Sequence, residues 1–446
     1  MSASKHFRDV FTKKHLYLIY LSDIRYRGAP GIDRINQGSF FKHHAEYIDI
    51  VLRKAHTGSY QFSSYQEKLI SKGQNKPPRL ISIPTFRDKL TLKALFEVLK
   101  LTFGSSSTFL HKTVDEIVSE IESKDYNAYL KLDVKEFYPS INHRILLDEI
   151  RKKIRKREIL SLIENAISRA TILKPGKGIK KTVRKGVPQG LSISNVLANI
   201  YMAPIDEEYS IANNYKYFRY VDDILILCQI EDIKRIKRTI INDLGKLDLE
   251  VHPENGENPK TDWGIIGEGG EEFNYLGYCF SHKKVSVKKE SIDRLRESII
   301  RHLTSFKYSN TCYKEEQLKW CLNLRITGCV LNDTKYGWLI YFSQINDINL
   351  LYSLDQFVIK QMGRFGVKHL TVKRFVRAYY EIRKNISNTK YIPNFDKTSN
   401  LQKCETIERV FGIDTKGMKN DDIEFQFKKR IFKFVKELEK DLAKHS

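Results

Sequence analysis

The sequence predicts a mixed α+β fold, and two features of the chain lead to this class. Apolar runs at 217–221 and 224–228 flank a pair of aspartates, which is the pattern of a strand, a tight turn and a returning strand. From about residue 288 onward strand patterns fade, and apolar residues such as Ile292, Leu295 and Ile299 recur at helical spacing. We therefore expect a sheet in the middle of the chain and a helical C-terminal part.

The other elements are predicted from apolar periodicity and from the residues that break it. A buried strand is expected to end at Asp133, and a Gly-Ser-rich break at 104–108 separates two helices. The expected helices are 1–25, 90–101, one that follows the break, a basic one at 151–157, 192–202 and a basic amphipathic one at 424–435, and the expected strand elements are 128–133 and a hairpin at 172–183.

Asp222 and Asp223 lie at the tip of the predicted central hairpin. Adjacent carboxylates repel each other unless a cation lies between them, and Mg²⁺ is usually held by one or two carboxylates plus substrate phosphates. Asp133 would supply a third carboxylate and the Val134 carbonyl a further ligand, as a two-metal site requires. Each acid also has a plainer interpretation, because aspartates are common in β-turns and at the starts of helices.

A third block lies between these acids along the chain. Gly186, Pro188 and Gly190 predict a turn in which the backbone approaches a neighbouring segment closely, followed by a helix lined with small residues. Turns of this composition are common, so the block alone is compatible with a purely structural role.

The order of the three blocks resembles the palm domain of reverse transcriptases, in the prokaryotic branch that holds group II intron, retron and defence-associated enzymes. Residues 132–141, 186–195 and 220–223 match three catalytic motifs of that family. Weaker matches extend the resemblance over about residues 25–280, and they are 28–33 (an N-terminal extension motif), 79–89 (a fingers motif), 258–261 (a loop whose lysine approaches the nucleotide phosphates) and 275–278 (a primer-grip hairpin).

This resemblance implies the right-hand polymerase architecture, in which an α+β fingers and palm region carries an antiparallel sheet and the thumb is α-helical. Residues 1–125 would form the N-terminal extension and fingers, and 126–285 the palm, with fingers elements interleaved around 150–185. Residues 286–446 would form the helical thumb and C-terminal region.

The resemblance also implies RNA-directed DNA synthesis by nucleotidyl transfer with two Mg²⁺ ions, for which Mn²⁺ would substitute. Asp133, Asp222, Asp223 and the Val134 carbonyl would bind the metal ions. Lys260 would protonate the leaving pyrophosphate or screen its charge.

Five further residues would contact the substrate. Tyr138 matches the position at which a bulky ring excludes a 2′-hydroxyl and so favours deoxynucleotides, although it could instead be a core residue. Gln189 and Gly190 would contact the base pair or the template backbone. Arg79 is the candidate clamp for the triphosphate, with Lys72 as a competitor on the same basic loop.

The charge of the chain agrees with a polyanionic partner. Lys and Arg number 77 against 54 Asp and Glu, a formal net charge of +23, and a basic surface binds nucleic acid through release of counterions. No apolar run reaches the roughly 18 residues of a membrane span, and the polar start is not a signal peptide. Six scattered cysteines without a CxxC pair fit reduced thiols in the cytoplasm.

The type of reverse transcriptase is decided by weaker features. The Cys/His endonuclease tail of intron enzymes and the Asn-Ala-x-x-His element of retron enzymes are not found, whereas 322–345 resembles the C-terminal region of stand-alone defence-associated enzymes. That resemblance implies a structured noncoding RNA as template, dNTPs, a cDNA product, and a second protein or the cDNA itself as effector against phage. A retron-like enzyme, an intron-derived enzyme and an inactive polymerase fold retained for RNA binding stay open as alternatives.

Overall fold

The computed structural model describes residues 2–25, 28–71, 77–104, 110–173, 183–254, 260–308 and 315–442. The fold is α+β, as the sequence predicts, and the chain divides into two compact units. The first unit comprises Met1–Thr108 and Asn127–Trp263, and the second comprises Phe109–Tyr126 and Gly264–Ser446. This grouping differs from the three regions expected from the sequence, whose boundaries stay a prediction.

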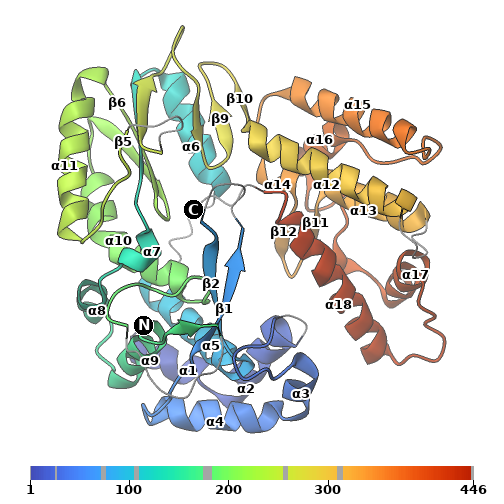
Figure 1. Ribbon diagram of the computed structural model, residues 1–446, viewed down its shortest axis with the longest axis horizontal. Coiled ribbons are helices and arrows are strands. Elements are labelled where there is room, and N and C mark those ends of the chain that lie inside the picture. Colours follow the sequence, from blue (N-terminus) through green and yellow to red (C-terminus); the bar gives the residue numbers. More distant parts are fainter. Residues whose placement is uncertain are drawn as a thin grey trace. The chain divides into compact units, whose positions relative to one another are not determined.

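A four-stranded sheet carries the residues of interest in the first unit (Figure 1). The hairpin and the buried strand predicted from the sequence are both present, and they pair with each other in antiparallel register. Almost every residue of the two central strands is buried, which explains their nearly continuous apolar sequences. The strand order is β5 (Tyr215–Tyr220), β6 (Asp223–Cys228), β3 (Ala128–Asp133) and β7 (Asp262–Ile265).

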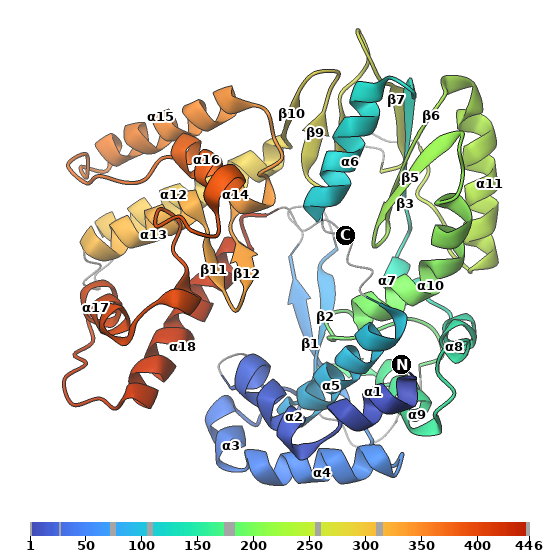
Figure 2. The same cartoon turned by 180° about the vertical axis from the view of Figure 1, so that it is seen from behind.

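Helices of the first unit share one hydrophobic core with this sheet (Figure 2). The long helix predicted at 90–101 extends further in both directions. It begins earlier because the Thr85 side chain caps its start by accepting from the Asp88 N–H. The helix predicted at 192–202 begins at Ser194. These helices are α5 (Phe86–Phe103), α8 (His143–Arg151), α9 (Arg157–Ile167), α10 (Ser194–Tyr209) and α11 (Ile233–Lys246).

Two helix predictions in this unit were wrong. The single helix expected over 1–25 is broken, because the Thr12 side chain accepts from the His15 N–H and starts a second helix. The basic helix expected at 151–157 is instead the connection between α8 and α9. Its like charges repel one another on a helix, and its one apolar residue, Ile154, is fully buried. The N-terminal helices are α1 (Ala3–Val10), α2 (Lys13–Ile19), the π-helical turn η1 (Tyr20–Ile24), α3 (Gln37–Lys42) and α4 (His44–His56).

A second sheet of the first unit has the order β2-β1-β4. It contains β1 (Tyr65–Ile70), β2 (Arg79–Ile83) and the short β4 (Thr171–Ile172). Most of the hairpin predicted at 172–183 lies outside the described residues, so that prediction is not tested. Near this sheet, Lys89 donates to the Ala29 carbonyl, which brings the two N-terminal motifs of the resemblance together.

The second unit is mainly helical, in agreement with the periodicity beyond residue 288. The basic amphipathic helix predicted at 424–435 is present and buries Phe427, Ile431 and Val435 in a local core. The helices are α6 (Leu110–Ser123), α12 (Lys289–Tyr308), α13 (Glu315–Thr327), α14 (Trp338–Tyr341), α15 (Ile348–Arg364), α16 (Phe375–Asn385), α17 (Asn400–Phe411) and α18 (Asn420–Leu438).

Two small sheets complete this unit. The hairpin matched at 275–278 joins β8 (Phe273–Tyr275) to β9 (Tyr278–Phe280), and β10 (Val285–Val287) pairs with β9. A hairpin that was not predicted joins β11 (Cys329–Leu331) to β12 (Thr334–Tyr336). Within the described part of the chain, no helix is long and apolar enough to cross a membrane.

Candidate active site

Backbone pairing brings the three predicted acids together at one end of the central sheet. Asp133 and Asp223 are direct cross-strand partners, and so are Tyr220 and Asp223. Val221 and Asp222 are therefore the two central residues of the hairpin turn. Direct partners place their side chains on the same face of a sheet, and Asp133 lies close enough to raise the pKa of Asp223. The Val134 N–H also donates to the Asp222 carbonyl at 3.4 Å.

The turn has an unusual backbone. Val221 has φ +58°, a conformation that β-branched residues rarely adopt and that costs about 1–3 kcal/mol. Tight hairpins with right-handed strand twist need positive φ at the first central position, where glycine is usual. The surrounding structure must therefore hold this turn in place.

Arg219 provides that support. Its side chain is only 7% exposed, and its guanidinium donates to both carboxylate oxygens of Asp206, at 2.7 Å from Nε and 2.5 Å from Nη2. From the same group, Nη1 donates to the Val221 carbonyl at 2.8 Å. A bidentate pair of this kind is rigid, so Arg219 links α10 to the strained turn. No pattern in the sequence had marked Arg219 as a residue of the site.

Burial dominates the electrostatics of the two turn acids. Burial is the largest cause that raises the pKa of Asp222 to about 7, and the negative charges of Asp223 and Asp133 add to it. Burial also raises the pKa of Asp223 to about 6, against the opposing charge of Lys131. In addition, Oδ1 of Asp222 is buried and has no hydrogen-bond partner. Buried, mutually repelling carboxylates with an unpartnered oxygen are the donor set that a divalent cation would stabilise.

Among the described residues, however, no group of three or more His, Cys, Asp or Glu side chains is arranged so that it could hold a metal ion. The Asp133 carboxylate instead faces Lys260, whose Nζ lies 2.7 Å from Oδ2. The predicted ligands Asp133, Asp222, Asp223 and Val134 are thus brought together, while their role as metal ligands stays a prediction.

His252 is a second residue of the site that no sequence pattern indicated. Its N–H donates to the Asp133 carbonyl at 2.9 Å, and its ring Nε2 lies 3.3 Å from Oδ2 of the same residue. Burial and the neighbouring Lys260 lower the pKa of His252. A histidine 119 positions along the chain from Asp133 carries no local pattern that would have revealed this contact.

Tyr138 lies beside the acids and is fixed at two points. Its hydroxyl donates to Oδ1 of Asn195 at 2.6 Å, and its carbonyl accepts from the Val187 N–H at 2.8 Å. Burial, followed by the charge of Asp222, raises the pKa of the Tyr138 phenol. The ring is therefore neutral and is held between the Gly-Pro turn and α10.

The glycine turn makes the close approaches that its sequence predicts. Gly190 has φ +96°, and a Cβ there would lie 2.8 Å from Cγ2 of Ile81. The Gln189 carbonyl accepts from the Ser82 N–H at 2.8 Å. Gln189 and Gly190 are thus anchored on β2, the strand that also begins with Arg79.

Arg79 lies near enough to the site for its positive charge to oppose part of the rise in the pKa values of Asp222 and Tyr138. The predicted catalytic residue Lys260 also lies in the site. The competing triphosphate ligand Lys72 lies outside the described residues, so the choice between it and Arg79 is not tested.

The comparisons with known proteins find one family model and several distant relatives. Residues 70–280 match the family model described as "Reverse transcriptase (RNA-dependent DNA polymerase)". The chain is 22% identical to protein YkfC of Escherichia coli over 288 residues, which are 53% of this chain and 74% of that protein. It is 25% identical to the group II intron-encoded protein LtrA of Lactococcus lactis over 225 residues, which are 46% of this chain and 36% of that protein.

Solved structures of fungal telomerases are also similar. Apo telomerase from Candida tropicalis matches with a TM-score of 0.44 and 16% identity, covering 82% of this chain and 68% of that one. Telomerase from Candida albicans in complex with a fragment of telomeric RNA matches with a TM-score of 0.45 and 14% identity, covering 91% and 67%.

Proposed function

From the premise that the chain contains a reverse transcriptase domain over residues 70–280, and is thus an RNA-dependent DNA polymerase, we propose how its residues perform that reaction. The observation that carries the proposal is the convergence of Asp133, Asp222 and Asp223 through the pairing of β3, β5 and β6. The substrates would be an RNA template and dNTPs, and the product would be cDNA.

The three carboxylates and the Val134 carbonyl would hold the divalent cations, two Mg²⁺ ions for which Mn²⁺ would substitute. Bound there, these ions would lower the pKa of the attacking hydroxyl and neutralise the triphosphate. The unpartnered oxygen of Asp222 supports this assignment. Lys260 would leave Asp133 when a cation takes its place and would then protonate or screen the pyrophosphate, which its 62% exposed side chain makes feasible.

The residues around the acids would orient the substrate. Tyr138 would place its neutral ring against the sugar and exclude a 2′-hydroxyl. Gln189 and Gly190 would contact the template or base pair, and Arg79 would bind the triphosphate as a bidentate donor. Their common support is the anchoring of the glycine turn on β2.

Primer extension on an RNA template tests the proposed site. Asp222→Asn and Asp133→Ala should each abolish dNTP incorporation in the presence of Mg²⁺, while RNA binding persists. Asp49→Asn removes an exposed carboxylate on α4 that pairs with Lys13, and this control should extend primers like the wild type. Retained extension by either active-site variant would refute the metal-ligand assignment.

We propose further that the enzyme acts in the bacterial cytoplasm, in defence against phage, with a structured noncoding RNA as its template and a second protein or the cDNA as effector. The support is the resemblance of 322–345, which forms the end of α13, the β11–β12 hairpin and α14. The intron-encoded relatives favour an intron-derived enzyme as the second candidate. The chain spans 36% or less of the length of the intron-encoded relatives.

Phage plating separates these two candidates. Phages should form fewer plaques on bacteria that carry the gene with its flanking DNA than on bacteria that carry the Asp222→Ala variant. The Asp49→Asn control should protect the bacteria like the wild type. Equal plaque numbers across a broad phage panel, with cDNA still produced, would refute the defence role and favour a retroelement.

A further inference from the structure

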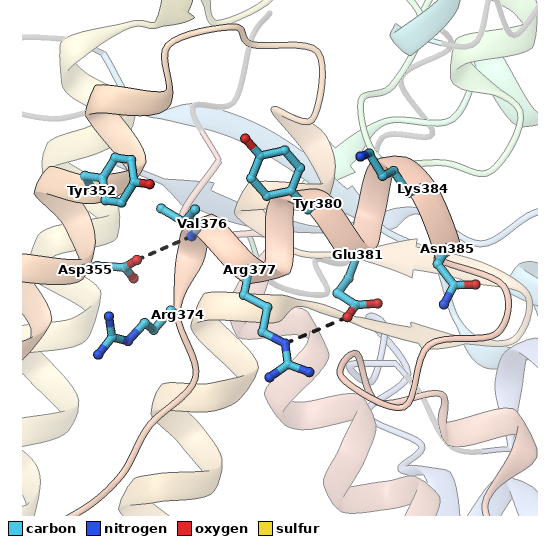
Figure 3. Close-up of a pocket in the computed structure, with 9 residues that line it drawn as sticks. All are labelled: Tyr352, Asp355, Arg374, Val376, Arg377, Tyr380, Glu381, Lys384 and Asn385. Carbon is cyan, nitrogen blue, oxygen red and sulfur yellow. Dashed lines mark hydrogen bonds and ion pairs between the residues drawn. The ribbon is translucent and has the colours of Figure 1, made fainter.

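The second unit contains a cavity of about 510 Å³ between α15 and α16. Its volume lies in the range of small-molecule and nucleotide sites. Figure 3 shows Tyr352 of α15 and Tyr380 of α16 with Val376 between them, and Arg374 and Arg377 extending below. All residues of the cavity belong to the second unit, and none of them is one of the acids of the central sheet.

The two tyrosines are unusually exposed for side chains of their size. Tyr352 is 57% exposed and Tyr380 is 45% exposed, whereas Tyr379, the neighbour of Tyr380, is buried. Exposed aromatic rings beside positive charge provide stacking surfaces for unpaired bases, and they work for every base because each has a π-face. Lys384 Nζ already lies 5.6 Å from the centre of the Tyr380 ring, which is cation–π geometry.

Positive charge is concentrated on the same face. The cavity is lined by three basic residues, Arg374, Arg377 and Lys384. They come from α16 and its N-cap, as does Tyr380. Arg377 is held by stacking on Tyr391, with its guanidinium carbon 4.5 Å from the ring centre. Over residues 351–400 the sequence has ten Lys and Arg against three Asp and Glu, a net charge of +7.

The two acids that line the cavity are already engaged. Asp355 accepts from the Phe375 N–H at 2.7 Å and from the Val376 N–H at 3.4 Å, and so it caps α16. Glu381 lies 3.8 Å from Arg377. The basic groups therefore dominate the face that a ligand would meet, and the Glu381 carboxylate remains able to accept from a neutral hydroxyl.

We propose that this cavity binds an unpaired segment of RNA, with bases stacked on Tyr352 and Tyr380 and phosphates near Arg374, Arg377 and Lys384. RNA fits better than DNA because Glu381 would accept from a 2′-hydroxyl, the group by which proteins distinguish the two sugars. The proposal deepens the proposed function and rests on it, since it gives the polymerase a place outside its catalytic acids that holds single-stranded RNA.

Fluorescence anisotropy with the full chain and no dNTPs tests the proposal, so that a failure of the polymerase assignment leaves the readout unaffected. The probes are labelled single-stranded U₁₂ RNA, dT₁₂ DNA and a 12-base-pair RNA duplex. The Tyr352→Leu/Tyr380→Leu double variant should bind U₁₂ about tenfold or more weakly than the wild type. Its binding to the duplex should be unchanged, and dT₁₂ should bind the wild type more weakly than U₁₂.

Matched variants distinguish stacking from a general loss of structure. Tyr308→Leu removes another tyrosine of this unit, 69% exposed at the end of α12, and should bind U₁₂ like the wild type. Tyr352→Phe/Tyr380→Phe keeps both ring faces and should also bind like the wild type. Crosslinking of a 4-thiouridine RNA should map to peptides that contain Tyr352 or Tyr380.

Four results would overturn the proposal. Unchanged U₁₂ binding by the double Leu variant would exclude stacking. An equal loss in the double Phe variant would show that the hydroxyls or the fold, and not the ring faces, matter. Equal affinity for dT₁₂ would exclude the RNA-specific role of Glu381, and displacement of U₁₂ by poly-glutamate as effective as that by unlabelled RNA would identify a surface for acidic peptides.

Discussion

Asp222 combines burial with like charge, and this combination predicts a pH-dependent cost to the metal-free protein. Its pKa is raised to about 7, above the value of about 3.9 for an unfolded aspartate. Between pH 4 and pH 7 the folded state therefore binds a proton on Asp222 that the unfolded state has released. As a result, the free energy of unfolding falls as the pH rises from about 4 to about 7.

Asp222→Asn should remove this cost. In EDTA at pH 8 the variant should be more stable than the wild type by about 4 kcal/mol, and at pH 4 the two should be similar. Urea unfolding at both pH values measures the difference, with Asp49→Asn as the exposed control. A wild-type protein that is the more stable of the two at pH 8 in EDTA would contradict the raised pKa.

Tyr138 leads to a prediction about sugar selection. Tyr138→Ala should increase the incorporation of rNTPs relative to dNTPs, because the ring that would exclude the 2′-hydroxyl is gone. Tyr138→Phe loses only the hydrogen bond to Asn195, worth about 1 kcal/mol, and should keep the preference for dNTPs. The measurement is the ratio of kcat/KM for a dNTP to kcat/KM for the matching rNTP. An unchanged ratio in the Ala variant would indicate that Tyr138 is a packing residue.

At the scale of elements, the β5–β6 turn depends on the bracing of Val221 by Arg219 and Asp206. Arg219→Lys keeps the charge but loses the bidentate geometry, so the strained turn and its two aspartates should become less ordered. We expect kcat for dNTP incorporation to fall about tenfold, equivalent to about 1.4 kcal/mol, with little change in RNA affinity.

The control for this prediction is Arg235→Lys, which alters an exposed ion pair with Asp232 on α11. Steady-state kinetics should separate the two variants, since only Arg219→Lys should lower kcat. If KM alone rises, Arg219 contributes to substrate binding and does not position the turn.

The elements also show what local sequence can predict. The β5–β6 hairpin and β3 were predictable because each is specified by a short apolar pattern with polar residues at its end. The β11–β12 hairpin was missed because its strands have three residues each, although the Asn332-Asp333 pair, with φ of +51° and +54°, is a recognisable tight-turn sequence.

Long-range contacts of the site were beyond such patterns. The sequence placed Asp133, Asp222 and Tyr138 in the site through motifs, but His252 and the bracing role of Arg219 depend on which distant segments meet. His252 reaches Asp133 because residue 251 forms an isolated β-bridge with Val134, and no local periodicity specifies that bridge.

At the scale of the whole molecule, we expect the net charge of +23 to determine the affinity for nucleic acid, and the acids of the central sheet to determine catalysis. Counterion release makes the affinity for a polyanion fall linearly with the logarithm of the salt concentration. The acids of the central sheet contribute little to this term, so variants such as Asp222→Asn should keep the salt dependence of the wild type.

If about six or more phosphates are neutralised, affinity for a structured RNA should fall about a thousandfold or more between 50 and 200 mM salt. Titrations by filter binding over this range measure the slope. In parallel titrations with single-stranded U₁₂, the Tyr352→Leu/Tyr380→Leu variant should lose affinity without a change in slope, because stacking releases no counterions. A flat response in the wild type would show that the basic residues are dispersed over the surface and do not form a continuous nucleic-acid interface.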